Sequence, residues 1–431
     1  MQSPRRIAAL CGPLPLLRAD YSPTVYIIIG VPLYFVNRFR YNIRMGYEVY
    51  LKKGEEKRIV AGHPWVYANE VARIEGKDKN GALATVRAFD GRFIGKGYIN
   101  HASKILVRVF LRGDEEDNEA LYFSRIHAAN ESRKRLGYSN CYRAVFAEAD
   151  DLPALIVDKY GDYLSVQLLS LGVYLRKKLI IDALVKEFSP KGIYERSDVA
   201  VRKKEGLPEE TGVLYGAVPD EVEICENGIR MLVDIKRGQK TGYFLDQKEN
   251  RYAVRRYARG EVLDCFCNSG GFSLNAATVA DNVTAVDVSP LALETVQKNA
   301  ALNGFENITT VCGDAFELLR AFKAEGRQFD CVILDPPAFC KSAAEAQDAC
   351  RGYSDINLIG LKLVKKGGYL VTCSCSHYVP MPLFLKTVTE AAKRSGRRVQ
   401  CLETRSQAPD HPALLCADET QYLKCLILKV E

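Results

Sequence analysis

The sequence has no Cys-x-x-Cys pair, no Gly-x-Gly-x-x-Gly fingerprint and no apolar run as long as a membrane span. Its 14 cysteines are scattered over 431 residues, and several lie inside apolar segments such as VLDCFC and FDCVIL. This pattern is typical of reduced cytosolic thiols that pack as small apolar side chains, and it disfavours a disulfide scaffold and a structural zinc site. We therefore expect a cytoplasmic protein without a bound metal. The missing glycine fingerprint argues against a dinucleotide cofactor.

Excess positive charge is scarce over most of the chain, although the net charge is +7. Residues 1–44 hold six arginines against one acid, Asp20, so +5 lies there and only +2 belongs to the rest of the chain. A surface for nucleic acid would therefore have to come from local patches of lysine and arginine.

The apolar stretch TVYIIIGVPLYFV, residues 24–36, has only 13 residues and contains Gly30 and Pro32. A bilayer span needs roughly 20 residues, and no small-residue cleavage site of a signal peptide follows. Met45 opens a segment typical of the start of a domain. We interpret residues 1–44 as an atypical extension produced by a misplaced start codon, and we expect no membrane association. The alternative is a membrane-associating arm.

The length predicts two or three domains. Residues 45–118 contain short alternating segments (YEVYLKK, ALATVRAFD, FIGKGYIN and KILVRVF) that predict a small all-β domain, with Trp65 in a loop. Residues 119–220 predict a central mixed α/β domain. In this region EALYFSRIHAANESRKRL and VYLRKKLIIDALVKEF have helical periodicity, and YGDYLSVQLLS between them is typical of a strand.

Residues 221–431 predict a doubly wound, mostly parallel α/β sheet, because strand-like and helical segments alternate. One helix is marked at both ends: Ser289 can cap it, Pro290 suits its first turn and Gly304 suits its end. The strand-like segments are EVLDCFC, NVTAVDV, ITTVCGD, FDCVILD and GGYLVTCSC.

Acidic residues end the first three of these strands, where ligands bind in such sheets. Asp264 is followed by a turn with Asn268 and Gly270, in which the backbone can approach a ligand closely. Asp287 is placed to accept both hydroxyl groups of a ribose, and Asp314 lies within reach of an adenine. A nucleoside cleft without a phosphate grip fits S-adenosylmethionine better than NAD or ATP. For each acid, helix capping is the alternative.

The fourth strand ends in Asp335-Pro336-Pro337, a stiff extended turn that would hold a carboxylate and Phe339 at the cleft. An aromatic ring in this place can stack on a planar base, and Asp335 can hydrogen-bond the edge of that base. A simple packing loop is the alternative.

The fifth strand ends with two cysteines, Cys373 and Cys375, which share one face because side chains alternate along a strand. Carbon 5 of cytosine is too weak a nucleophile to take a methyl group directly. A thiolate that adds at carbon 6 makes the ring enamine-like, and after methylation a base removes the carbon-5 proton and the thiolate leaves. Cys375, nearer the open end, fits this role, whereas Cys373 fits buried packing. Spacing alone leaves open whether both thiols only pack. We expect the pKa of Cys375 to be depressed only when cofactor or RNA is bound.

Nine segments between Met45 and the C-terminus match one family. They are HPWVY, EADDLPALIVDKYGDYLSVQLLS, YERSDVAVRKKEG, VDIKRGQKTGYFLDQKENR, DCFCNSGGFS, DPPAF, ACRGYSDIN, TCSCS and QAPDHPALLCADETQYLK. The chain resembles the RlmI-type bacterial large-subunit rRNA cytosine-5 methyltransferases. The resemblance implies an RNA-binding PUA domain over 45–118, a central α/β domain over 119–220 and a class I, Rossmann-like, S-adenosylmethionine-dependent methyltransferase domain over 221–431.

The resemblance also implies roles for individual residues. Cys375 would be the nucleophile, and Asp335, Pro336 and Phe339 would contact the base. The segment GQKTGYFLDQ would close over the cofactor. The implied cofactor contacts are Asp264, Asn268, Gly270, Asp287, Asp314, Phe244 and Gln247, and the implied phosphate contacts are Arg58, Lys104 and Arg108, for which solvated surface charge is the alternative.

One position departs from other RNA cytosine methyltransferases, which carry a second cysteine directly after the proline pair. Here that residue is Ala338, and the role is not transferred to Cys340. The base that removes the carbon-5 proton therefore has no candidate. The expected partner is large-subunit rRNA, free or in an assembling particle, and the sequence also allows a homodimer.

Three other functions remain open from the sequence. The first is an rRNA guanine methyltransferase of the same fold, which would stay active in Cys375→Ala. The second is a noncatalytic RNA-binding assembly factor with a retained cofactor pocket, which is disfavoured by the full set of acids. A dehydrogenase is the third, and the missing glycine fingerprint weakens it.

Overall fold

The computed structural model describes residues 46–340 and 342–431. The extension expected over residues 1–44 lies outside this described part. None of the helices described has both the length and the apolar content of a membrane span.

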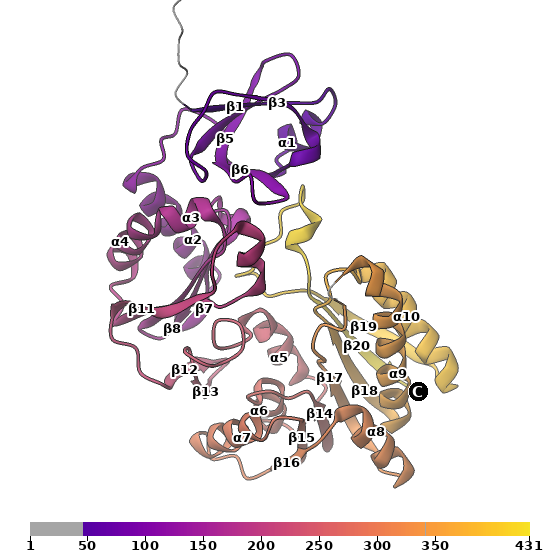
Figure 1. Ribbon diagram of the computed structural model, residues 1–431. Coiled ribbons are helices and arrows are strands. Elements are labelled where there is room, and N and C mark those ends of the chain that lie inside the picture. The colour runs from indigo at the N-terminus through magenta and orange to yellow at the C-terminus, as the bar shows by residue number, and fades with distance from the viewer. Residues whose placement is uncertain (1–45, 341) are drawn as a thin grey trace, which may run out of the picture. The chain divides into compact units, whose positions relative to one another are not determined.

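The first domain is a six-stranded sheet with the order β2-β6-β5-β4-β1-β3. It is the indigo to violet part of the ribbon in Figure 1. All neighbouring pairs are antiparallel except β1 and β4. Alternate apolar side chains such as Val49, Val86 and Val107 fill its core, as period-two patterning requires. The elements are β1 (Tyr47–Leu51), α1 (Glu56–Val60), β2 (Trp65–Tyr67), β3 (Val71–Glu75), β4 (Leu83–Arg87), β5 (Phe93–Ile99) and β6 (Ile105–Leu111).

The central domain is a five-stranded sheet with the order β11-β10-β9-β8-β7, in which only β9 and β10 are parallel. Helices α2 and α4 pack against it through Tyr122, Ile126, Ile180 and Leu184. The elements are α2 (Glu119–Arg135), β7 (Cys141–Phe146), β8 (Leu155–Tyr160), β9 (Tyr163–Leu168), α3 (Leu171–Leu175), α4 (Lys177–Phe188), β10 (Gly192–Ser197) and β11 (Glu210–Gly216).

The last region opens with an antiparallel hairpin of β12 (Val222–Glu226) and β13 (Ile229–Val233), which the sequence analysis did not predict. A seven-stranded sheet with the order β16-β15-β14-β17-β18-β20-β19 follows. Strands β14 to β18 are parallel, and β20 is antiparallel to both of its neighbours. The strands are β14 (Glu261–Cys265), β15 (Asn282–Asp287), β16 (Ile308–Cys312), β17 (Phe329–Leu334), β18 (Val364–Ser374), β19 (Val399–Arg405) and β20 (Lys424–Val430).

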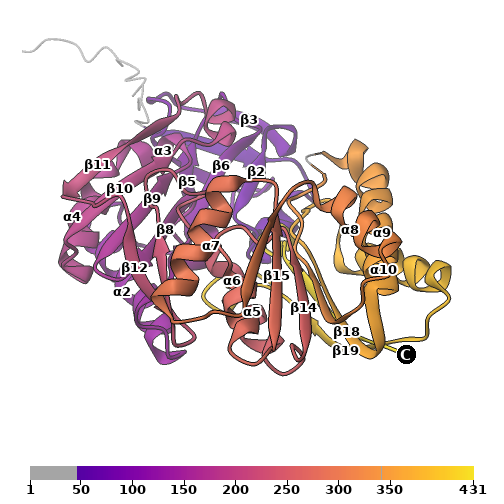
Figure 2. The ribbon, with the colours of Figure 1, turned by 90° about the horizontal axis from the view of Figure 1, so that it is seen from below.

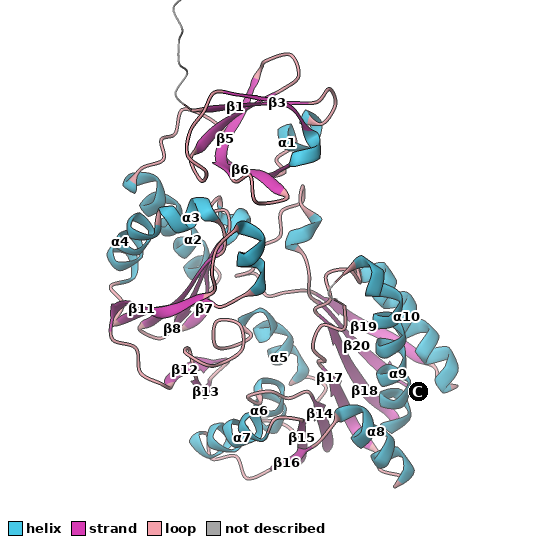
Figure 3. Ribbon diagram, in the orientation of Figure 1, coloured by secondary structure: helices cyan, strands magenta, loops and turns pink. Residues whose placement is uncertain are grey.

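Helices cover both faces of this sheet (Figure 2). Helices α8 to α10 pack on one face, where Phe322, Tyr353 and Phe384 are buried, and α5 and α6 pack on the other with Val254 and Phe272. The helices are α5 (Lys248–Val254), α6 (Gly271–Ala277), α7 (Pro290–Leu302), α8 (Ala315–Ala324), α9 (Ala346–Leu363) and α10 (Met381–Ser395). Figure 3 shows the alternation of strands and helices that the sequence predicts for this domain.

The ends of α7 follow the sequence prediction, whereas β2 and the helices over residues 173–188 differ from it. Ser289 caps α7 by accepting a hydrogen bond from the Ala292 amide, and Gly304 follows the helix at φ +70°. Trp65 was expected in a loop but begins β2, because its backbone pairs with β6 at Arg108. The helical pattern over residues 173–188 is divided between α3 and α4, and Leu175 at this break is exposed.

Candidate active site

The order of the seven strands reverses between β14 and β17. From β14 the chain runs outward through β15 and β16, then crosses back to β17 and β18 on the other side. In open α/β sheets, ligands bind outside the carboxyl ends of the strands at such a switch point. Asp264 lies in β14, Asp335 follows β17 and Cys375 follows β18, so all three meet at this edge.

Asp264 is a fully buried carboxyl group. One oxygen, Oδ2, accepts a hydrogen bond of 2.5 Å from the Ser273 hydroxyl, whereas Oδ1 has no partner in the described part of the chain. Burial, together with the nearby carboxylates of Asp335 and Asp287, raises the pKa of Asp264 to about 7. A buried acceptor without a partner is costly, so this atom is suited to a ligand group that donates a hydrogen bond.

The loop after β14 has an unusual backbone. Phe266, Asn268 and Gly270 all lie in the left-handed region, at φ +65°, +48° and +87°. Left-handed residues other than glycine cost roughly 1–3 kcal/mol each and cluster at functional sites. The positive φ at position 270 favours glycine, and a Cβ atom there would approach the Val296 side chain to 3.1 Å, so that side chain would have to shift by a few tenths of an ångström.

Asp287 and Asp314 have different surroundings. Asp287 accepts the Asn268 amide on Oδ2 and the Ser289 amide on Oδ1, both at 2.9 Å, which fixes its carboxylate at the end of β15. Asp314 caps helix α8 by accepting the amides of Phe316 and Glu317. Asp314 therefore acts as a helix cap, the alternative to a cofactor contact, although its carboxylate lies at the carboxyl edge of the sheet.

Asp335 and Gln247 form a hydrogen-bonded pair. Gln247 Nε2 donates to Asp335 Oδ1 at 2.9 Å, and Gln247 Oε1 accepts from Asn250 Nδ2 at 2.7 Å. Burial, together with the carboxylate of Asp246, raises the pKa of Asp335 to about 7. Gln247, expected as a cofactor contact, is thus directed toward Asp335. Phe244, from the same segment, lies under the Lys240 ammonium, 4.4 Å from the ring centroid.

Pro336 is buried, and Phe339 is half-buried beside Tyr353. The Phe339 ring centroid lies 4.6 Å from that of Tyr353 and 5.8 Å from that of Phe316. The Tyr353 hydroxyl is in turn hydrogen-bonded to the Ser376 hydroxyl at 2.9 Å. Phe339 therefore packs one face against the protein and connects the loop after β17 to the loop that contains Cys375.

The two cysteines that raised the nucleophile question have different environments. Cys373 is fully buried within β18, directly opposite Cys425 of β20. Cys375 lies just after the strand and is only partly buried. Burial and the carboxylates of Asp335 and Asp246 raise the pKa of Cys375, and two lysines, Lys240 and Lys424, lower it. Of the two thiols, Cys375 alone is at the open edge.

The sequence analysis missed four residues around this thiol. Asp246 Oδ2 accepts from Lys240 Nζ at 3.0 Å and from the Tyr422 hydroxyl at 2.6 Å. Lys424 is buried and interacts electrostatically with Cys375. All four lie inside two of the family segments, GQKTGYFLDQ and the one ending in TQYLK, but nothing in those strings indicates that the two segments meet.

The expected phosphate contacts do not share one environment. Lys104 is exposed. Arg58 donates to Glu70 and to the Trp65 carbonyl. Arg108 is only 8% exposed and is held between Glu148 at 2.9 Å and Glu205 at 3.0 Å. Arg108 is poorly placed to contact a phosphate, because its guanidinium group is buried and already paired with two carboxylates.

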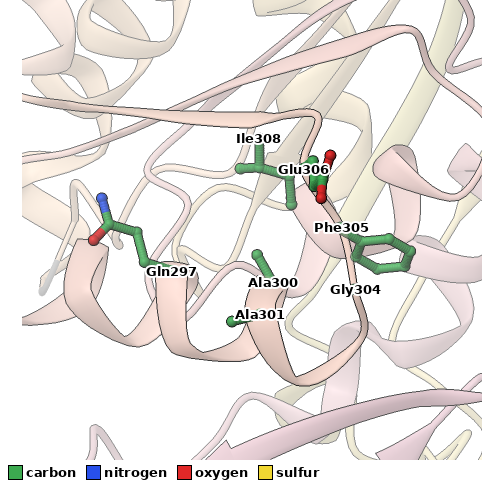
Figure 4. Close-up of a pocket in the computed structure, with 7 residues that line it drawn as sticks. All are labelled: Gln297, Ala300, Ala301, Gly304, Phe305, Glu306 and Ile308. Atoms are coloured by element: carbon green, nitrogen blue, oxygen red, sulfur yellow. The ribbon is translucent and has the colours of Figure 1, made fainter.

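A surface pocket of about 440 Å³ lies away from this edge (Figure 4). Ala300, Gly304 and Phe305 line it at the end of α7, together with Ile308, the first residue of β16. Since the first residue of a parallel strand marks the edge opposite its carboxyl end, this pocket is not part of the candidate site.

The residues at the carboxyl edge fit the methyl donor S-adenosylmethionine. The carboxylate of Asp287 keeps acceptor capacity for ribose hydroxyls, Oδ1 of Asp264 lacks a donor, and the exposed Val288 offers an apolar surface beside them. A phosphate would instead need amide groups or cations at the loop after β14, where the acids Asp264 and Asp287 stand.

Two family models match the chain. A PUA-like domain matches residues 49–112, and an S-adenosylmethionine-dependent methyltransferase matches residues 201–428. Among solved structures, a putative S-adenosylmethionine-dependent methyltransferase from Streptococcus mutans has a TM-score of 0.76 at 21% identity and covers 89% of this chain and 100% of its own. Another, described as a putative methyltransferase complexed with SAH, has a TM-score of 0.77 at 20% identity over 89% of this chain and 100% of its own. These likenesses confirm the expected fold and the cofactor.

Curated relatives are more similar in sequence. Ribosomal RNA large subunit methyltransferase I of Aeromonas salmonicida is 44% identical over 391 residues, which cover 88% of this chain and 98% of the relative. The protein of the same name from Shewanella amazonensis is 43% identical over 395 residues, or 90% of this chain and 100% of the relative. The chain therefore belongs to the family of ribosomal RNA large subunit methyltransferase I, whose members use S-adenosylmethionine.

Proposed function

We propose that the protein methylates carbon 5 of a cytidine in large-subunit rRNA and that Cys375 forms a covalent adduct at carbon 6 of the base. One observation carries the choice of chemistry: a partly buried thiol follows β18 at the carboxyl edge, beside the carboxyl group that follows β17. Methylation of an exocyclic amine or of a ring nitrogen needs no thiol at this position. The choice of large-subunit rRNA is based on the names of the curated relatives.

The residues of the site divide the chemistry among them. Asp264 and Asp287 would hold S-adenosylmethionine, which would supply an electrophilic methyl group. The Cys375 thiolate adds to carbon 6 of the cytosine, and the electron pair displaced from the double bond makes carbon 5 nucleophilic. Because burial raises the pKa of Asp335 to about 7, its protonated form is accessible near neutral pH and can donate a hydrogen bond to the base edge. After methylation, a base from solvent takes the carbon-5 proton, the electron pair of that C–H bond re-forms the carbon 5–carbon 6 double bond, and the thiolate leaves.

The first experiment uses large-subunit rRNA from a strain without this gene, labelled S-adenosylmethionine and purified protein. We expect labelled 5-methylcytidine after digestion to nucleosides. Cys375→Ser should abolish it, with a loss of at least about a thousandfold in kcat, because the oxygen nucleophile adds poorly to the ring. Cys401→Ser is the matched control, since this cysteine is exposed on strand β19 and lies away from the carboxyl edge.

A second arm traps the adduct. RNA with 5-fluorocytidine cannot lose the group at carbon 5, so the wild-type protein should remain attached to it, and Cys375→Ser should not. A labelled guanosine product, or activity that survives Cys375→Ser, would instead favour the guanine methyltransferase. An absence of S-adenosylmethionine binding would favour the noncatalytic assembly factor.

A further inference from the structure

We propose that Lys424 is a positioning residue that holds the Cys375 loop and stabilises the Cys375 thiolate. This inference rests on the proposed role of Cys375 as the nucleophile. Strand β20 is antiparallel to β18, and its first residue, Lys424, lies directly opposite Ser374, the last residue of β18. The register therefore sets the Lys424 side chain beside the turn in which Cys375 stands.

The hydrogen bonds of Lys424 fix this turn. Its Nζ donates to the Ser376 carbonyl at 2.7 Å and to the Tyr422 carbonyl at 2.8 Å. The Ser376 hydroxyl is anchored separately by the Tyr353 hydroxyl. Residue 376 is thus held from two sides, and Cys375, its neighbour, is limited to a narrow set of positions.

The charge of Lys424 lacks a fixed partner. The side chain is only 4% exposed, and in residues 46–340 and 342–431 it forms no ion pair and reaches only two neutral carbonyl groups. Other buried cations in the same described residues are paired, for example Lys248 with Asp410, Arg143 with Asp158 and Arg251 with Glu226. A buried cation without a counter-ion is unfavourable, so an anion that forms beside it is stabilised.

Cys375 supplies such an anion. Four charged side chains act on its thiol: Asp335 and Asp246 disfavour the thiolate, whereas Lys240 and Lys424 favour it. Lys240 is already paired with Asp246, which leaves Lys424 as the cation whose charge is not compensated. Burial lowers the pKa of Lys424 to about 8, opposed by Cys375, so the ammonium form still predominates at neutral pH.

The lysine keeps its own proton through the reaction. The thiol proton passes to solvent, the sulfur gives its charge to the base when it adds to carbon 6, and the charge returns to sulfur when the adduct breaks. Lys424 stabilises the sulfur anion at both ends of this sequence. A more stable thiolate is also a better leaving group.

The test measures the thiol itself, so it does not depend on methyl transfer. The rate of iodoacetamide alkylation at Cys375 is followed by mass spectrometry of its peptide from about pH 6 to about pH 10. Lys424→Met should slow alkylation at neutral pH about tenfold, which corresponds to an apparent pKa about one unit higher. Lys429→Met, on the same strand but paired with Glu431 at the surface, should leave the rate unchanged.

Lys424→Gln separates the two parts of the proposal. Its amide can still donate to both carbonyls but has no charge, so a purely structural role would be rescued and a role of the charge would not. We expect the glutamine variant to bind SAH normally and to alkylate as slowly as Lys424→Met. Wild-type alkylation rates in Lys424→Gln would overturn the proposal, whatever the methylation assay shows.

The reciprocal measurement needs no change at Lys424. Because the coupling of two charges is mutual, removal of the thiolate in Cys375→Ser should lower the apparent pKa of Lys424, read from the pH dependence of its competitive acetylation. An unchanged Lys424 profile would contradict the coupling. If the coupling is present but Cys375→Ser still forms 5-methylcytidine, the proposed nucleophile fails while the Lys424–Cys375 interaction stands.

Discussion

The carboxyl group of Asp264 is shielded from water on the protein side of the site, and its ionised form is therefore costly to the fold. Its folded pKa of about 7 lies above the ordinary value of 3.8. A raised carboxyl pKa contributes stability below about pH 4, and this contribution is lost as the pH rises through about 7. The free energy of unfolding of the ligand-free protein should fall over this window on account of this residue.

Asp264→Asn removes this dependence. We compare the free energy of unfolding of the variant with that of wild type at about pH 5 and at about pH 8. The difference should shift in favour of the variant from the lower to the higher pH, by on the order of 3 kcal/mol. Thermal unfolding at both pH values measures it. Asp348→Asn, an exposed position at the start of α9, provides the control. A difference between Asp264→Asn and wild type that is the same at both pH values would contradict the assignment.

Single residues differ in how far they could be predicted. Asp264, Asp335 and Cys375 were predictable as site candidates because each ends a strand of recognisable pattern, and the carboxyl ends of parallel strands share one edge. Lys424 and Asp246 were not predictable. They reach the thiol only because strand β20 runs antiparallel beside β18 and because the segment before α5 folds over the same edge, neither of which local periodicity encodes.

Among the elements, the loop between β14 and α6 is the part of the site most sensitive to backbone change. Gly270 is left-handed, and a Cβ atom added to it would lie 3.1 Å from the Val296 side chain. Gly270→Ala should weaken SAH binding about tenfold, because the strained loop moves away from the ligand. Isothermal titration measures the loss.

Gly304→Ala is the matched control for that change. Gly304 is also left-handed, at φ +70°, but a Cβ atom there would have no neighbour within 4 Å, and it lies at the far end of α7. Both variants should lose about 1 kcal/mol of stability from backbone strain. Only Gly270→Ala should lose affinity, and an equal loss in both would indicate a general effect of destabilisation.

Some boundaries of helices and strands could be predicted from the sequence alone, and others were missed. The cap at Ser289 and the end of α7 at Gly304 were predictable, since both depend on neighbours in the sequence. The hairpin of β12 and β13 was missed, and Trp65 was placed in a loop. The hairpin joins two strands that are neighbours in the sequence, and its turn, Asn227-Gly228, is a dipeptide typical of two-residue hairpins, so this element was predictable from a local signal. Strand β2, by contrast, has only three residues to carry a pattern and pairs with the distant strand β6.

At the scale of the whole molecule, Arg108 joins the PUA-like domain to the central domain through the buried carboxylates of Glu148 and Glu205. Arg108→Ala would leave both acids without their cation, which typically costs about 3–5 kcal/mol. We expect a large drop in the unfolding temperature of this variant.

The neighbouring Lys104 should behave in the opposite way. Lys104→Ala should leave stability unchanged, weaken RNA binding modestly and reduce the slope of log affinity against log salt concentration by about one, as expected for a single phosphate contact. Filter binding at several salt concentrations measures this slope. An unchanged slope would remove Lys104 from the RNA surface.

The strand order of the last sheet also has a consequence for protein synthesis. Strand β20 is made after β19 but lies between β19 and β18. While the chain is being translated, β19 lacks its native partner β20 and β18 keeps an open edge, so this half of the sheet cannot assemble in the order of its synthesis. Until β20 is made, the nascent chain has an exposed strand edge, which is prone to mispairing. Cys375, at the end of β18, acquires Lys424 as its neighbour only when β20 inserts.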